Sequence, residues 1–338
     1  MNSKKELPED PPIHDWMDEK EKGFRKEAKN KLLKAIRFGL LPIDKVDEGK
    51  IKAFSEGQTS ATFFIDGTPY PFVFKMTKKG QSIINEVKFI NKWKELGINT
   101  LEVLQLHQGS SEFPDPFALY KYLDLPLLSE ATTIKQRVKR GISREMGITL
   151  AKMHQPIGEG YGWAVAGKGF KGEFDSLKEY SEDVLFQDRI PKLIKSGVIG
   201  DDYIEVARKA LKIMEEDIRA DSKTCLNHDD FLPNNIFYNE EKNEIIPFDP
   251  NSRLNHPYAC LASTLIRSLA EEEDPVAARH EYKEILKGYS SVSKVDEKLL
   301  RAAIILRSLR VMPIWHKKGF NKRNTNLIKE LEEYRKYL

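Results

Sequence analysis

The chain has 338 residues, a formal net charge of +3, and a composition of 40% hydrophobic and 32% charged residues. This length allows two domains with a sizeable core, and the ordinary composition excludes a largely disordered chain. The near-neutral charge offers no basis for a nucleic-acid partner. The chain has 2 cysteines, Cys225 and Cys260, which are too few for a disulfide framework. We therefore expect a cytoplasmic protein.

The N-terminal part predicts a tail and a helix. Residues 1–19 are polar and proline-rich at their start, which is typical of a flexible tail. In residues 20–38, apolar side chains recur at every fourth position from Phe24 to Ile36, and basic residues fill the other faces. We expect this helix to pack on the first domain, and the alternative is a membrane-surface or partner-binding helix. No secretory signal and no apolar run long enough to span a membrane is expected.

The first third of the chain predicts a β-β-α-β-β order. Its β-rich segments and its helix are separated by turn signals. They are strands at 61–65 and 72–75 around a turn at 66–69, a helix at 80–96, and strands at 101–107 and 117–123.

Helices dominate the remainder. Helical periodicity and end signals predict helices at 143–156, 201–219, 258–272, 275–289, 296–310 and 324–337. One break occurs at 225–249, where a loop rich in Asn, Asp and Pro precedes two short apolar runs, 235–238 and 245–248. These runs predict a small hairpin within a helical domain.

The break carries the polar groups that phosphoryl transfer requires. His228-x-Asp230 is followed five residues later by Asn235, and Asp249 follows Phe248. Phosphoryl transfer needs a carboxylate to accept the acceptor's hydroxyl proton, and carboxylate and amide oxygens to hold magnesium. We predict Asp230 as the catalytic base and Asn235 and Asp249 as Mg²⁺ ligands. The alternative for His228 and Asp230 is a turn closed by polar side chains.

The pattern His228-x-Asp230-x-x-x-x-Asn235 resembles the catalytic loop of the protein-kinase-like superfamily. In detail it resembles the aminoglycoside phosphotransferase family of small-molecule kinases. Pro233 within the loop, the pair Asp249-Pro250, and the upstream segment 150–162 carry this resemblance.

The resemblance implies an α+β, two-lobed, protein-kinase-like fold. A small antiparallel sheet lobe would span 20–122, and a mostly helical lobe would span 123–338. It also implies that His228 and Asp230 are catalytic-loop residues and that the cofactors are ATP and Mg²⁺, with GTP as an alternative donor. The protein would be a monomer or dimer.

The resemblance also assigns nucleotide-binding candidates in the first lobe. A loop with Ser55, Gly57, Thr59 and Ser60 would face the phosphates, Lys75 would pair with them, and Glu86 would orient Lys75. Tyr120 and Tyr122, in the segment 120–123, would contact the adenine through their backbone. The alternatives are an ordinary turn, a lysine at a strand end and an edge strand.

Several other functions compete. Cys225-x-x-His228 and His256-x-x-x-Cys260 have spacings that resemble a zinc site. A protein kinase needs an activation segment after its metal-binding aspartate, but here Tyr258 begins a predicted helix nine residues after Asp249. A Walker-type nucleotide loop is absent from the sequence.

A catalytically silent nucleotide-binding module is a further alternative. Relatives often have an aspartate that braces the catalytic loop, and this chain has Cys260 at that place. Loop bracing is therefore the feature of the family pattern that this sequence does not reproduce.

The acceptor is expected to be a small hydroxyl-bearing molecule, such as an aminoglycoside, an amino sugar or a choline-type compound. The acidic run 271–274 is a candidate site for a cationic acceptor, and its alternative is a solvated helix end. Trp163, Tyr258 and Trp315 are candidates for stacking on a ring, and core packing is the alternative.

Overall fold

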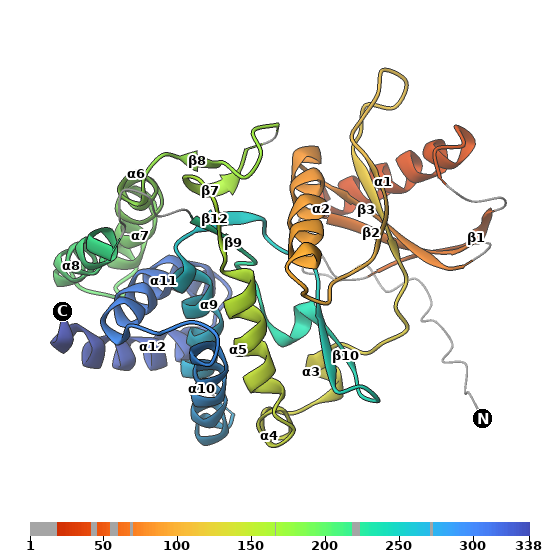
Figure 1. The fold of residues 1–338 in the computed structure, drawn as a ribbon. Coiled ribbons are helices and arrows are strands. Elements are labelled where there is room, and N and C mark those ends of the chain that lie inside the picture. The colour runs from red at the N-terminus through yellow and green to blue at the C-terminus, as the bar shows by residue number, and fades with distance from the viewer. Residues whose placement is uncertain are drawn as a thin grey trace. The chain divides into compact units, whose positions relative to one another are not determined.

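The computed structural model describes residues 19–41, 46–54, 60–67, 70–165, 167–217, 224–270 and 273–338. The chain divides into two compact units, Met1–Asn91 with Leu101–Asp124, and Lys92–Thr100 with Leu125–Leu338 (Figure 1). The predicted tail, apart from its last residue, and the predicted loop residues Ser55, Gly57 and Thr59 lie outside the described residues. The expected lobe boundary at residue 122 stays a prediction.

The first unit contains a five-stranded antiparallel sheet with the order β1-β2-β3-β5-β4. The strands are β1 (Val46–Ala53), β2 (Ser60–Gly67), β3 (Phe72–Thr77), β4 (Val103–His107) and β5 (Phe117–Lys121). The helices are α1 (Glu19–Arg37) and α2 (Gly80–Glu95), of which the last turn belongs to the second unit. The predicted β-β-α-β-β order is confirmed, and β1 is an additional strand.

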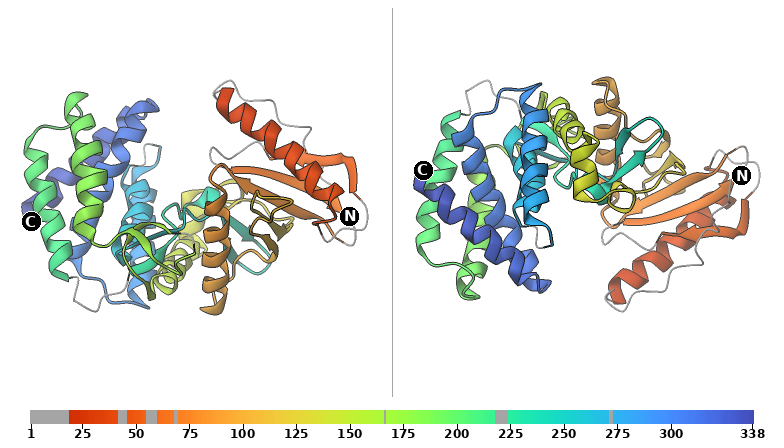
Figure 2. Two further views of the ribbon diagram at one scale, coloured as in Figure 1. Left: turned by 90° about the horizontal axis from the view of Figure 1, so that it is seen from above. Right: turned by 90° about the horizontal axis from the view of Figure 1, so that it is seen from below.

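The two helices cover opposite faces of this sheet (Figure 2). Successive side chains of a strand point to opposite faces, so Phe74 packs toward α1 while Val73 packs toward α2. Ala28 and Leu32 of α1 are fully buried in the same core as Phe74. The prediction that the basic helix packs on the first unit is therefore confirmed.

The second unit contains a second five-stranded sheet and a separate hairpin. The sheet has the order β6-β9-β12-β7-β8, with strands β6 (Pro156–Gly158), β7 (Tyr161–Ala164), β8 (Gly172–Phe174), β9 (Thr224–Asn227) and β12 (Arg253–Asn255). The hairpin pairs β10 (Ile236–Asn239) with β11 (Glu244–Pro247). The sequence predicted the hairpin and not the sheet, because strands of three or four residues are too short to show a period of two.

The helices of the second unit confirm the six predicted ones and add shorter segments. They are α3 (Leu128–Ala131), α4 (Ile134–Lys139), α5 (Ile142–Met153), α6 (Leu177–Ser181), a π-helical segment Glu182–Arg189, α7 (Ile190–Lys195), α8 (Asp202–Asp217), α9 (Pro257–Leu269), α10 (Pro275–Ser290), α11 (Glu297–Lys317) and α12 (Asn321–Tyr334). Single 3₁₀ turns lie at Pro233–Asn235 and Arg335–Tyr337. Among the described residues, no helix combines the length and apolar composition that a membrane crossing needs.

Helix α9 is the centre of the second unit. Most of its residues are buried, and it packs against α5, α10, α11 and α12 (Figure 1). A helix that is apolar on nearly all sides is typical of a buried core element. Its start is specified locally, because the side chain of His256 accepts a hydrogen bond from Tyr258 N and Pro257 occupies the first helical position.

Glycine permits a close crossing of α5 and α10. A Cβ atom on Gly147 would lie 2.0 Å from the carbonyl oxygen of Ile285, and one on Gly288 would lie 1.9 Å from that of Arg144. Both distances are shorter than any van der Waals contact allows. We infer that an alanine at either position would force the two helices apart.

Candidate active site

The loop after β9 places Asp230 and Asn235 side by side. The side-chain nitrogen of Asn235 donates to the carbonyl oxygen of Asp230 at 2.9 Å and to its Oδ2 at 2.8 Å. Both bonds use the amide nitrogen, so they leave the amide oxygen of Asn235 free to act as a ligand. The predicted pair is therefore brought together.

The hairpin returns the chain to this loop through three hydrogen bonds. Phe248 N donates to the carbonyl oxygen of Asn235 at 3.0 Å, and Asn251 N donates to that of His228 at 2.9 Å. His228 Nε2 lies 2.9 Å from the carbonyl oxygen of Phe248. Asp249 is held between these contacts, so the residue predicted as the second metal ligand lies beside the predicted loop.

Two aspartates of this region adopt left-handed backbone conformations. Asp229 has a φ of 59° and Asp249 has a φ of 55°. This region costs non-glycine residues about 1 kcal/mol, and aspartate is among those that tolerate it best. Such strain persists only where surrounding contacts impose it, and it clusters at functional sites.

His228 is held as a neutral ring in the core. Burial lowers its pKa despite the nearby charges of Asp230 and Asp249. Its contact with a carbonyl oxygen requires a proton on Nε2, and the ring stacks on Trp93 at 5.7 Å with an interplanar angle of 3°. This geometry suits a residue that positions the loop.

Lys75 and Glu86 form a buried ion pair in the first unit. Strand alternation points Lys75 to the face covered by α2, and Glu86 lies on the helix face that carries Ile83, Val87 and Ile90. The Lys75 Nζ atom lies 2.8 Å from Oε1 and 2.7 Å from Oε2 of Glu86. The predicted pair is thus in contact.

The side chain of Tyr120 is buried and contacts the ion pair, and the predicted backbone contact with adenine stays a prediction. Its hydroxyl donates to Oε1 of Glu86 at 2.8 Å, so its side chain supports the ion pair. Strand β5 lies between β3 and β4, which shows that the edge-strand alternative is wrong. Tyr122 follows β5, and its ring centre lies 4.8 Å from that of Phe64. Ser60, the predicted loop residue that the structure describes, is buried at the start of β2, where it pairs with Thr77 of β3.

Replacing Glu86 by glutamine is expected to lower the free energy of unfolding by about 2 kcal/mol, because it removes the carboxylate charge that lies against the buried Lys75 ammonium group. Urea unfolding at pH 7 measures this change. The matched control is Glu95→Gln, which breaks an exposed pair with Lys92 and is expected to change stability by less than about 0.5 kcal/mol. Equal effects of the two substitutions would contradict the importance of the buried pair.

Helix α9 and helix α11 brace the loop that carries Asp230 and Asn235. Ser263 Oγ and Arg307 Nη2 donate to the carbonyl oxygen of Asp229 at 3.3 and 3.0 Å, and Thr264 Oγ1 donates to that of Phe231 at 3.1 Å. Burial raises the pKa of Cys260 to about 12, so its thiol is neutral. The bracing expected from an aspartate at this place is therefore distributed over other residues.

These bracing residues were not identified from the sequence. Ser263 and Thr264 follow Cys260 by three and four residues on an otherwise apolar helix, so they share its face, and this pattern was the available signal. Arg307 comes from a helix far along the chain, and no local pattern connects it with the loop.

The zinc alternative gains no support from the contacts. Cys225 Sγ donates to the carbonyl oxygen of Asn255 at 3.3 Å, and His228 is bonded to Phe248. Within the part of the chain that the structure describes, no group of three or more His, Cys, Asp or Glu residues is arranged to hold a metal ion.

The sequence profile of the phosphotransferase enzyme family APH matches residues 50–291. The chain belongs to this family. The predicted class, a small-molecule kinase rather than a protein kinase, is confirmed at the level of the family. No curated protein sequence matches the chain.

Solved structures show the same fold for members of this family and for related proteins. Aminoglycoside phosphotransferase APH(4)-Ia is 13% identical, with a TM-score of 0.61 over 92% of this chain and 98% of that one. A Ralstonia eutropha protein assigned as an aminoglycoside phosphotransferase is 13% identical, with a TM-score of 0.58 over 91% and 98%. A Thermobifida fusca protein assigned as a fructosamine-3-kinase is 11% identical, with a TM-score of 0.53 over 82% and 93%. The kinase-like α+β fold is therefore confirmed.

Proposed function

We propose that this APH-family protein transfers the γ-phosphoryl group of ATP to a hydroxyl group of a small molecule. The observation that carries the proposal is the set of hydrogen bonds joining the loop of Asp230 and Asn235 to the segment of Asp249. These are the base and metal-ligand types that the reaction requires.

Each residue has a defined part in this proposal. The Asp230 carboxylate accepts the proton of the acceptor hydroxyl as the new oxygen–phosphorus bond forms and ADP leaves. Lys75, oriented by Glu86 and Tyr120, binds the donor phosphates. His228 acts as a positioning residue, because it ties the loop to the residue before Asp249.

The donor set of Asn235 and Asp249 fits magnesium. An amide oxygen and a carboxylate are hard ligands, and Mg²⁺ in such sites binds one or two protein oxygens together with substrate phosphates. When bound, Mg²⁺ neutralises charge on the nucleotide phosphates. Solved relatives are complexes of APH(4)-Ia with ADP or AMP-PNP and hygromycin B, and a GDP complex of aminoglycoside 2'-phosphotransferase-IIIa. ATP is therefore the first donor to test, with GTP second.

The described part of the acidic run 271–274 has a structural role. The Asp274 side chain caps α10 by accepting from Ala277 N at 3.0 Å, and it pairs with Lys135 at 2.8 Å. Tyr258 and Trp315 are buried, as core packing predicts, and Trp163 is exposed. These contacts give no specific support to a polycationic acceptor.

A cytoplasmic location fits two buried, unpaired cysteines.

The proposal is tested by a phosphorylation screen with ATP or GTP and Mg²⁺ against aminoglycosides, amino sugars, choline and nucleosides. We expect turnover with at least one acceptor, and we expect excess EDTA to abolish it because the phosphates lose their counter-ion. Transferred ³²P measures both results. Nucleotide binding without transfer to any hydroxyl compound would instead favour the silent-module alternative.

A further inference from the structure

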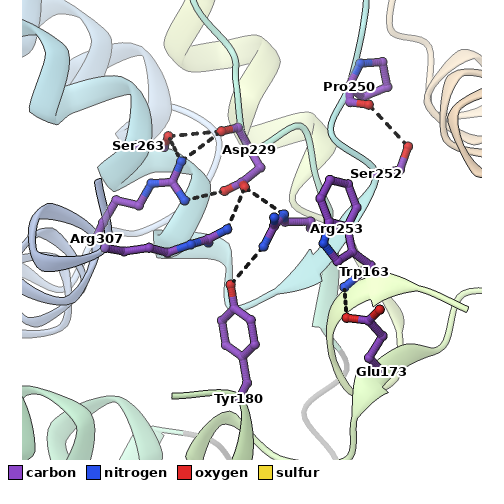
Figure 3. Close-up of polar contacts among 10 residues, drawn as sticks. Trp163, Glu173, Tyr180, Asp229, Pro250, Ser252, Arg253, Ser263 and Arg307 are labelled. Atoms are coloured by element: carbon purple, nitrogen blue, oxygen red, sulfur yellow. Dashed lines mark hydrogen bonds and ion pairs between the residues drawn. The ribbon is translucent and has the colours of Figure 1, made fainter. Parts of the chain in front are cut away.

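Asp229, the residue before Asp230, is surrounded by three arginines. Its carboxylate lies 2.8 Å from Arg307 Nη1, 3.1 Å from Arg253 Nε and 3.3 Å from Arg310 Nη2. Figure 3 shows Arg253 and Arg307 converging on Asp229 from different elements, β12 and α11. We call these three arginines with Asp229 the arginine cluster.

The arginine cluster has an excess of positive charge. Three guanidinium groups face the single carboxylate of Asp229. Burial alone would raise the pKa of this carboxylate, but the neighbouring arginines lower it to about 2. Besides Asp229, the side chains of Tyr180 and Cys260 act on the three guanidinium groups, and burial raises the pKa of Cys260, so its thiol is neutral. The three arginines and Asp229 therefore have a formal net charge of two positive units.

These charges are largely removed from water, and part of their bonding capacity is unused. Side-chain exposure is 16% for Arg253, 11% for Arg307 and 13% for Arg310. Among the described residues, the buried Nε atom of Arg307 has no hydrogen-bond acceptor, and the Nε atom of Arg253 has only its ion pair with Asp229. Buried charges are normally paired, so an unpaired excess indicates a missing anion.

The neighbourhood of Asp230 is also basic. A further arginine, Arg267 of α9, is attracted by the charge of Asp230, and its guanidinium lies 5.0 Å from the centre of the Trp315 ring. The Arg253 guanidinium stacks on the exposed Trp163 at 4.0 Å, and Trp163 N donates to a carboxylate oxygen of Glu173 at 3.4 Å. Glu173 has no contact with the three guanidinium groups in the described part of the chain.

We propose that the acceptor carries an anionic group, a carboxylate or a phosphate monoester, which the arginine cluster binds. The inference rests on the proposed phosphotransferase function and specifies its substrate class. Planar guanidinium groups match both anions with two parallel hydrogen bonds. A polycation at the same place would be repelled.

The first test measures binding to the full chain by titration calorimetry. Saturating AMP-PNP and Mg²⁺ fill the nucleotide site, and the ionic strength is kept constant with chloride. The probes are gluconate, glucose 6-phosphate, glucose and kanamycin. We expect at least one of the two anions to bind at least tenfold more tightly than glucose, and kanamycin to bind most weakly. Gluconate and glucose 6-phosphate separate the carboxylate from the phosphate class. Equal binding of glucose, or preferential binding of kanamycin, would overturn the inference.

The second test uses Arg253→Gln, with Arg301→Gln on α11 as the matched control. Arg301 pairs with Glu297 on the helix surface, outside the cluster. We expect Arg253→Gln to weaken binding of the preferred anion about tenfold or more and Arg301→Gln to change it less than twofold. Unchanged anion binding in a folded Arg253→Gln protein would overturn the inference. If Arg253→Gln does not fold, the wild-type titration decides.

The same probes separate this inference from the proposed function. Anion binding without phosphoryl transfer to any acceptor would count against the phosphotransferase proposal and leave the anion site standing. Phosphoryl transfer only to neutral or cationic acceptors would support the phosphotransferase proposal and contradict the inferred anion site.

Discussion

Replacing Asp230 by asparagine is expected to reduce phosphoryl transfer by about a hundredfold to ten-thousandfold, the usual contribution of a positioned general base. Asparagine retains an oxygen that can accept the bond from the Asn235 side chain, now 2.8 Å long, so the loop should keep its conformation. The loss should therefore appear in kcat, with little change in the nucleotide KM or in the melting temperature. Steady-state kinetics with the acceptor found in the screen measure it.

The matched control is Asp183→Asn, at an exposed position of the π-helical segment. It carries the same change of charge and is expected to retain full activity. If Asp230→Asn turned over as fast as the control while remaining folded, the assignment of the base would be wrong. A loss caused by unfolding would show in the melting curve and would not count as evidence for catalysis.

Replacing Asp229 by asparagine is expected to lower the free energy of unfolding by about 3 to 5 kcal/mol, the cost of breaking a buried ion pair from one side. Arg253, Arg307 and Arg310 would then face one another without a carboxylate. Urea unfolding at pH 7 measures the change. The control Asp188→Asn removes a surface partner of Arg189 and Lys192 and is expected to change stability by less than about 1 kcal/mol.

The contribution of Asp229 to the free energy of unfolding should decrease as the pH falls. Its folded-state pKa of about 2 lies below the unfolded value of about 3.9, so its contribution is complete above about pH 5 and is lost as the pH falls toward 2. The difference between the wild type and Asp229→Asn should shrink over this range. A difference that is constant from pH 5 to 2.5 would show that the carboxylate charge is not what stabilises the cluster.

The local parts of the site could be predicted because their signals are short in sequence. The spacing of Asp230 and Asn235 fits one tight loop, and the two apolar runs after it predicted the hairpin that brings Asp249 back. The order of Lys75 on a strand and Glu86 on the next helix likewise predicted their contact. In each case a few residues of regular structure determine the relative positions.

The parts that sequence reasoning missed depend on pairing between distant segments. Strand β12 pairs with both β9 and β7, and no local sequence pattern predicts either pairing. The role of Tyr120 in supporting Glu86 required knowing that β5 lies inside the sheet rather than at its edge. Strand order within a sheet is set by packing of the whole unit, and so it cannot be read from the strands themselves.

The sequence by itself determined the family resemblance, the residue types of the proposed phosphoryl-transfer site and their order along the chain. Only the tertiary structure decided what surrounds them. It replaced the expected aspartate brace with Ser263, Thr264 and Arg307, and it gathered Arg253 and Arg310 at Asp229. The physical reason is that a charge acts on its neighbours in space. The balance of charge around Asp229 exists only after β12 and α11 have packed beside the loop.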